Sequence, residues 1–123
     1  MWLQLMGADV AGYSLTPPSN PNLFEVAKVG EGMHSIGGDV RDLDGLKRAL
    51  ANHKSEIVIH LAAQSLVRES YDDPAGTYST NIMGTVNVLE SVRCAESVRV
   101  VLIITTDKCY ENREWVWGYR ESD

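Results

Sequence analysis

Four short segments of the chain have the residue pattern of β-strands. They cover residues 10–13, 34–37, 57–61 and 100–104. The last two are apolar at consecutive positions, which is typical of strands covered by helices on both faces of a parallel sheet. The proline-rich segment 16–22 predicts a loop, because proline fixes φ and removes a backbone donor.

Two segments between these strands carry apolar residues at helical spacing. The first helix is expected to begin after Asp42, a good N-cap residue, and to end near His53. The second and longer one is expected to begin with Asp73 as its cap and Pro74 in its first turn. The apolar positions are Leu43, Leu46, Ala49 and Leu50 in the first helix, and Tyr78, Ile82, Val86 and Leu89 in the second. Alternating strands and helices predict right-handed crossovers and hence a doubly wound α/β sheet.

Composition narrows the possible partners. The 123 residues fit one small domain, and 44% of them are hydrophobic. Eleven basic against 17 acidic residues give a formal net charge of -6, which argues against nucleic acid as a partner. The longest apolar run, 100–104, is far shorter than the roughly 20 residues of a membrane-spanning helix, so no membrane association is expected. The first six residues make a poor signal peptide, and a cytoplasmic location is the expectation.

Candidate chemistry lies directly after each strand, where ligands bind in doubly wound sheets. The four segments are 12–14, 38–40, 62–65 and 105–108. Small residues in the third segment would let a flat cofactor approach the backbone. Asp39 offers a carboxylate acceptor for an exocyclic amine such as that of adenine, and capping of the following turn is its alternative role.

Taken in order, four motifs resemble the landmarks of the extended short-chain dehydrogenase/reductase family over essentially the whole chain. These motifs are residues 38–42, 60–64, 80–85 and 105–108. Within that family, segments 64–68, 77–81 and 107–121 look like the nucleotide-sugar dehydratase branch. The resemblance implies a Rossmann-like doubly wound parallel sheet.

The resemblance also implies an activity: a lyase that converts CDP-glucose to CDP-4-keto-6-deoxyglucose with tightly held NAD. By similarity, Thr106 hydrogen-bonds the C4 oxygen, Asp107 protonates the departing C6 hydroxyl, and Lys108 occupies the position of the C5 base. An ammonium has no lone pair, so a lysine accepts a proton only where burial or neighbouring cations favour its neutral form. The rivals are an epimerase or dTDP-glucose dehydratase of the same family, which residues 108–118 would discriminate, and a non-catalytic dinucleotide-binding remnant.

Similarity assigns the binding residues as well. NAD is preferred over NADP, because no Arg or Lys near Ser14 could take a 2′-phosphate, the first basic residue being Lys28. The cofactor residues expected are Ser14 at the ribose, Asp39 and Val40 at the adenine, Leu61, Ala62 and Ala63 along the middle of the dinucleotide, and Thr80 and Asn81 as supports. Gln64 and Ser65 are expected to face the sugar.

Two family features are missing from the sequence. The glycine-rich phosphate loop should lie roughly 20 residues before Ser14, which places it upstream of Met1. The Tyr-x-x-x-Lys pair should follow Lys108, yet no lysine follows Tyr119. We therefore expect residues 1–123 to be a partial domain that is inactive alone, from a homo-oligomeric parent. Its sheet would lack the central strand, leaving two strand pairs beside a vacant slot and marginal stability.

The remaining reactive and aromatic residues have simpler interpretations. His34, His53 and His60 lack the spacing of a metal site, so no bound metal is expected. Trp115 and Trp117 are expected to anchor their loop to the core, with stacking on a cytosine ring as the alternative. Two cysteines, Cys94 and Cys109, are predicted to be ordinary thiols.

Overall fold

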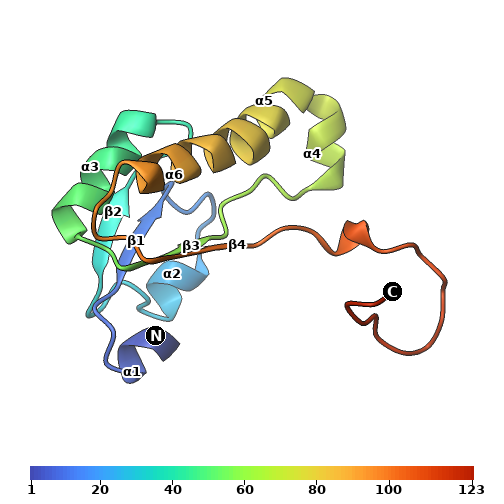
Figure 1. Ribbon diagram of the computed structural model, residues 1–123, viewed down its shortest axis with the longest axis horizontal. Helices are drawn as coiled ribbons and strands as arrows, with labels where there is room; N and C mark the ends of the chain where they lie inside the picture. Colours follow the sequence, from blue (N-terminus) through green and yellow to red (C-terminus); the bar gives the residue numbers. More distant parts are fainter.

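The strands form two parallel pairs. The computed structural model describes residues 1–123 except for the side chain of Asp107. Its strands are β1 (Ala11–Ser14), β2 (His34–Gly37), β3 (Ile57–His60) and β4 (Val100–Ile103) (Figure 1). β1 pairs with β2, and β3 with β4, in two separate two-stranded sheets. The four predicted strands, their parallel direction and their division into two pairs are confirmed, with boundaries shifted by one residue in three of them.

Helix α3 (Leu43–His53) matches its prediction at both ends. The Asp42 carboxylate accepts a hydrogen bond from the backbone N–H of Gly45 at 3.0 Å, which satisfies one unpaired donor of the first turn. Lys54 then ends the helix in a left-handed conformation with φ of 53°. Leu46 from the predicted apolar stripe is buried, at 7% exposure.

The long helix is built from three consecutive segments, and the short helix α4 (Val67–Asp72) precedes it. These segments are α5 (Pro74–Tyr78), a π-helical turn η1 (Ser79–Met83) and α6 (Gly84–Arg93). The Asp73 side chain accepts from Gly76 N–H at 2.9 Å, which confirms the predicted cap. The π-helical turn was not predicted, because a single extra residue in a helical turn leaves no clear sequence pattern.

The apolar positions predicted for the long helix are not the ones that pack. Tyr78, Ile82, Val86 and Leu89 are 64%, 51%, 47% and 48% exposed. The helix instead buries Gly84, Val88 and Ser91. A Cβ on Gly84 would lie 2.7 Å from Cγ2 of Val40, so glycine is what allows this close approach. Apolar spacing therefore identified a helix without showing which face the rest of the chain covers.

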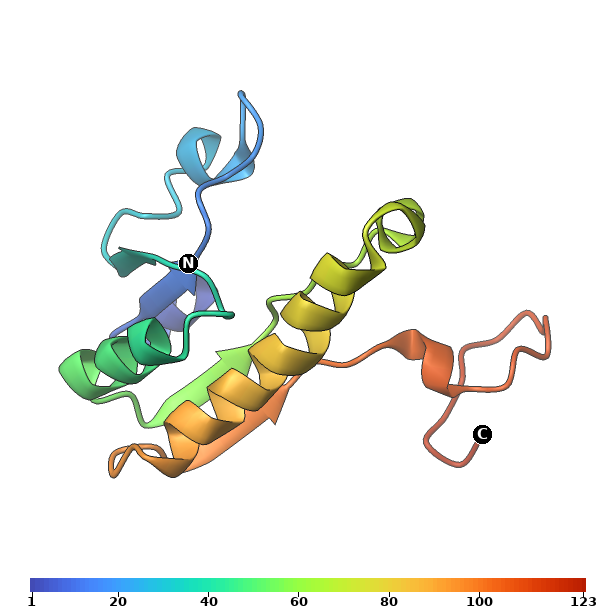
Figure 2. The same ribbon diagram turned by 90° about the horizontal axis from the view of Figure 1, so that it is seen from above.

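Three short elements lie outside the unit formed by the strands, α3 and the long helix. They are α1 (Trp2–Leu5), α2 (Leu23–Val26) and the 3-10 turn η2 (Asp107–Cys109). Residues 16–22 form the predicted loop. In Figures 1 and 2 the segment after β4 extends away from the strands and the long helix. Within the described part of the chain, no helix has the length and apolar character needed to cross a membrane.

The core is small for a chain of this length. The accessible surface is 9742 Å², against about 6,600 Å² for a compact protein of 13.6 kDa. The buried apolar side chains are Val40, Leu46 and Val88, and the buried polar ones are His60 and Ser91. Ile57, Ile59, Val100 and Leu102 are 41–61% exposed, so residues of this chain do not cover β3 and β4 on both faces as their sequence predicted.

We predict marginal stability or self-association for this chain in isolation. The apolar strand residues left exposed and the unpaired strand edges favour association between molecules. Thermal unfolding followed by circular dichroism should be broad, and light scattering after size-exclusion chromatography should show species larger than 13.6 kDa. A monodisperse monomer with a sharp two-state transition would contradict this prediction.

Candidate nucleotide-binding site

The loops that follow β2 and β3 are both held by the long helix. Asn87 donates its side-chain amide to the carbonyl oxygens of Val40 and Arg41, each at 3.0 Å. Asn81 accepts from the backbone N–H of Gln64 at 2.7 Å and donates to its carbonyl at 2.9 Å. Because both asparagines belong to one continuous helix, the two loops are fixed along the same scaffold.

Parallel strand pairing places the loops after β1 and β4 beside the loops after β2 and β3. Gly38 N–H donates to the Ser14 carbonyl at 2.9 Å, which places the end of β1 beside the loop after β2. Ile104 N–H donates to the His60 carbonyl at 3.0 Å, so the chain leaves β4 beside the loop after β3. The carboxyl ends of the strands are thus adjacent within each pair, and the long helix connects the pairs (Figure 2).

Asp39 is held as an ionised acceptor in the loop after β2. Its carboxylate accepts from the backbone N–H of Arg41 at 2.8 Å and from the guanidinium Nε at 2.9 and 3.0 Å. These hydrogen bonds from Arg41 lower the pKa of Asp39, although partial burial opposes them. The bond to the backbone is the turn-capping role considered as its alternative. A carboxylate can still accept further hydrogen bonds, since it has about four lone-pair sites.

Tyr13 supports this loop from β1, a role that the sequence did not reveal. Its hydroxyl donates to the Asp39 carbonyl at 3.3 Å. Burial, together with the nearby carboxylates of Asp42 and Asp39, raises the pKa of Tyr13. A Cβ on Gly38 would lie 2.2 Å from the Tyr13 ring, so glycine at this position lets the loop pass the ring. The tyrosine near the strand end and the glycines before Asp39 are the signal that could have indicated this contact.

Ser14 lies in the wall of a shallow pocket at the carboxyl ends of β1 and β2. Thr16, Phe24 and Gly37 also line this pocket. A Cβ on Gly37 would meet no atom within 4 Å, so the wall is open on that side. The location of Ser14 suits the ribose role predicted for it.

The segment after β3 has small exposed residues, followed by Gln64, whose side chain is hydrogen-bonded to other residues of the chain. Ala62 and Ala63 are exposed, as is Leu61 at 67%. The Gln64 side chain donates to Thr77 Oγ1 at 3.0 Å and to the Leu66 carbonyl at 3.1 Å. Gln64 therefore holds the loop in shape, in addition to any contact with a sugar. Ser65 is exposed and Thr80 is half-buried in η1.

The predicted catalytic residues follow β4. Thr106 caps η2 by accepting a hydrogen bond from the backbone N–H of Lys108 at 3.1 Å. Lys108, predicted to be the base, is exposed. The side chain of Asp107, predicted to be the acid, lies outside the described residues.

Trp115 and Trp117 pack on each other rather than on the core. Trp115 contacts Trp117 and Tyr119 with ring centroids 5.9 and 5.4 Å apart, and the guanidinium of Arg113 lies 5.3 Å from the Trp115 ring centroid. Tyr119 also stacks on Tyr110 at 5.2 Å. The expected anchor to the core is therefore wrong: these side chains form a local aromatic cluster in the segment that extends from the body.

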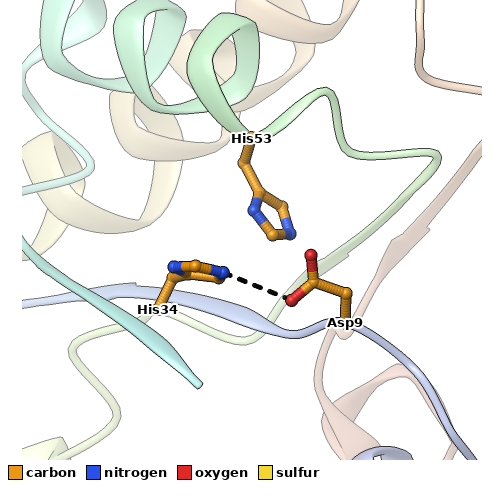
Figure 3. Close-up of side chains that lie close together, drawn as sticks. All are labelled: Asp9, His34 and His53. Atoms are coloured by element: carbon orange, nitrogen blue, oxygen red, sulfur yellow. Dashed lines mark ion pairs between the residues drawn. The ribbon is translucent and has the colours of Figure 1, made fainter. Parts of the chain in front are cut away.

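The three histidines have different environments. His60 is buried at 6% exposure and its ring lies 3.1 Å from Thr85 Oγ1, and burial lowers the pKa of His60. His34 and His53 instead meet Asp9 at the amino-terminal end of β1 (Figure 3). The fold thus places together three potential metal ligands that sequence spacing had not connected. Cys94 and Cys109 are free and exposed.

Comparisons with known proteins agree with this geometry. Residues 14–116 match the family described as GDP-mannose 4,6 dehydratase. The chain is 53% identical over its full length to the CDP-glucose 4,6-dehydratase of Salmonella typhimurium, of which it covers 34%. It is 41% identical to the UDP-glucose 4-epimerase of Rhizobium meliloti over 58 residues, which are 47% of this chain and 18% of that relative.

Solved structures confirm the Rossmann-like class. The UDP-glucose 4-epimerase of Bifidobacterium longum, solved with NAD+ and UDP, superposes with a TM-score of 0.75 at 26% identity and covers 89% of this chain and 33% of that one. The chain thus spans about a third of the length of the Salmonella dehydratase and of the Bifidobacterium epimerase.

We predict that Gly38→Ala destabilises the chain while Gly37→Ala does not. The added methyl at position 38 would meet the Tyr13 ring at 2.2 Å, whereas at position 37 it would meet nothing within 4 Å. Overpacking of this kind costs about 1–3 kcal/mol. Urea unfolding of both variants measures the difference, and equal stability of the two would show that the Tyr13 ring moves aside freely.

Proposed function

Because this chain belongs to the GDP-mannose 4,6-dehydratase family, we propose that it forms the cofactor-binding part of a nucleotide-sugar 4,6-dehydratase acting on CDP-glucose. The observation that carries the substrate assignment is the 53% identity over all 123 residues to a CDP-glucose 4,6-dehydratase. UDP-glucose 4-epimerases match with lower identity or over less of the chain, at 41% over 58 residues and 30% over 104 residues, which supports a dehydratase over the rival epimerase. The product would be CDP-4-keto-6-deoxyglucose.

The residues at the strand ends fit NAD. An ionised acceptor at Asp39 suits the adenine amine, and the small exposed Ala62 and Ala63 leave the backbone accessible to a flat dinucleotide. NAD, when bound, supplies the hydride acceptor and donor that an internal redox cycle needs. The other residues proposed to hold it are Ser14, Val40, Leu61, Thr80 and Asn81, the last through the backbone of Gln64.

The residues after β4 would hydrogen-bond the sugar and transfer its protons. Thr106 would donate its hydroxyl hydrogen to the C4 oxygen, and Asp107 would give a proton to the C6 hydroxyl as it leaves as water. Lys108 would remove the C5 proton. That last role requires a neutral amine, and since Lys108 is exposed here, the bound sugar and the remainder of a complete enzyme would have to desolvate it.

A second candidate is a dinucleotide-binding module without turnover. The observation in its favour is that the chain covers 34% of its full-length relative while containing all four strand-end loops. Nucleotide affinity and catalysis are separable measurements, so the two candidates can be tested independently.

The first prediction of this proposal concerns NAD affinity. Calorimetry on the 123-residue chain should detect NAD binding, and Asp39→Asn should weaken it about tenfold, because a charged acceptor is worth roughly 1.5–3 kcal/mol per hydrogen bond. Asp44→Asn, which removes an equal charge from an exposed position of α3, is the matched control and should leave the affinity unchanged. Absence of any NAD binding would reject the module while leaving the family assignment intact.

The second prediction concerns turnover. We propose that residues 1–123 alone do not convert CDP-glucose, because the sequence contains no tyrosine followed four positions later by lysine. A coupled assay for the 4-keto product with added NAD provides the measurement. Detectable product that disappears in Thr106→Val would overturn this claim and would at the same time support the role of Thr106.

A further inference from the structure

The amino-terminal ends of β1 and β2 carry a group of side chains that the dehydratase proposal does not use. Asp9 precedes β1, His34 is the first residue of β2, and His53 is the last residue of α3. Their ligand atoms all lie within 4.8 Å of one another. In Figure 3 the imidazole of His53 faces the space between His34 and Asp9. We propose that these three residues form a binding site for a divalent transition-metal cation, Zn²⁺ in the first instance.

The distances suit this chemistry. His34 Nε2 and Asp9 Oδ1 are 3.4 Å apart. Two ligands of a tetrahedral zinc ion, each about 2.1 Å from the metal, lie roughly 3.4 Å from each other, so this pair already has the separation of coordinated atoms. The rings of His34 and His53 are 5.2 Å apart between centroids and inclined by 59°, so they are tilted rather than stacked flat on each other. Coordination requires His53 to approach by a side-chain rotation.

The backbone fixes the positions from which these side chains project. His34 N–H donates to the Val10 carbonyl at 2.8 Å, which places His34 beside the residue that follows Asp9. Lys54 N–H donates to Leu50 at 2.9 Å and ends α3 directly after His53. α3 packs against β1. One ligand each therefore comes from α3, from β2 and from the segment before β1, without any change of fold.

The donor set selects the class of ion. Two imidazoles and one carboxylate suit Zn²⁺ and its first-row neighbours, whereas Mg²⁺ and Ca²⁺ prefer oxygen ligands. The Asp9 and His34 side chains are 73% and 65% exposed, so water can fill the remaining positions and the ion can enter directly from solvent. Such a site would join the ends of β1, β2 and α3 and stabilise that unit by binding the folded state.

Calorimetry with Zn²⁺ alone tests the site. The background is a Cys94→Ser, Cys109→Ser variant, since both thiols are exposed and could bind zinc themselves. We expect one ion per chain, and at least tenfold weaker binding in each of Asp9→Asn, His34→Gln and His53→Gln. Asp44→Asn is the matched control and should bind like the background. Mg²⁺ in millimolar excess should not compete. Binding should weaken as the pH falls, because only neutral imidazoles coordinate.

His60 provides an internal control that does not depend on the variants being folded. In nitrogen–proton spectra of histidine side chains, Zn²⁺ should shift the His34 and His53 signals and leave those of buried His60 in place. Zn²⁺ should also raise the unfolding temperature of the Cys94→Ser, Cys109→Ser background variant. The proposal is overturned if Zn²⁺ does not bind, if the three variants bind as tightly as the control, or if the signals of His34 and His53 do not respond.

Discussion

The side-chain amide of Asn87 donates to two backbone carbonyls in the loop after β2, and the rest of the structure depends on this contact. The two strand pairs form separate sheets, so no strand ladder joins them. The long helix provides the connection. Its close approach at Gly84 brings it against Val40, and Asn81 fixes the loop after β3 by a reciprocal pair of hydrogen bonds. Loss of this helix packing would separate Asp39 from the segments after β3 and β4. The strand ends proposed to bind a dinucleotide would then no longer lie together.

Local signals in the sequence were sufficient for the four strands, for α3 and the long helix, and for their order. Consecutive apolar residues identified β3 and β4, and capping aspartates at positions 42 and 73 located the starts of α3 and α5. The four ordered motifs indicated the family, which the match over residues 14–116 confirms. These features depend on short stretches of chain, so they can be predicted from the local sequence without knowing what packs against them.

Features that depend on packing were not predictable in the same way. The exposure of Ile82 and Leu89 and the self-packing of Trp115 reflect which surfaces the rest of the chain covers, whereas the π-helical turn leaves no clear sequence pattern. Tyr13 was overlooked because its partner is a backbone carbonyl 26 residues away. The roles of Ser14, Thr106, Asp107 and Lys108 rest on resemblance, since a chemical role is defined by ligands as much as by position.

Part of the proposed nucleotide site lies at the carboxyl ends of β1 and β2, and the proposed ion site lies at the amino-terminal ends of the same two strands. β1 runs from Asp9 and Val10 to Ser14, and β2 runs from His34 to Gly37, with Asp39 two residues further on. An ion bound at the amino-terminal ends would fix the relative position of the two strands, and the short parallel ladder would transmit that constraint to the loop around Asp39. In a chain with so small a buried core, such a constraint would order that part of the nucleotide site without contributing a ligand to it.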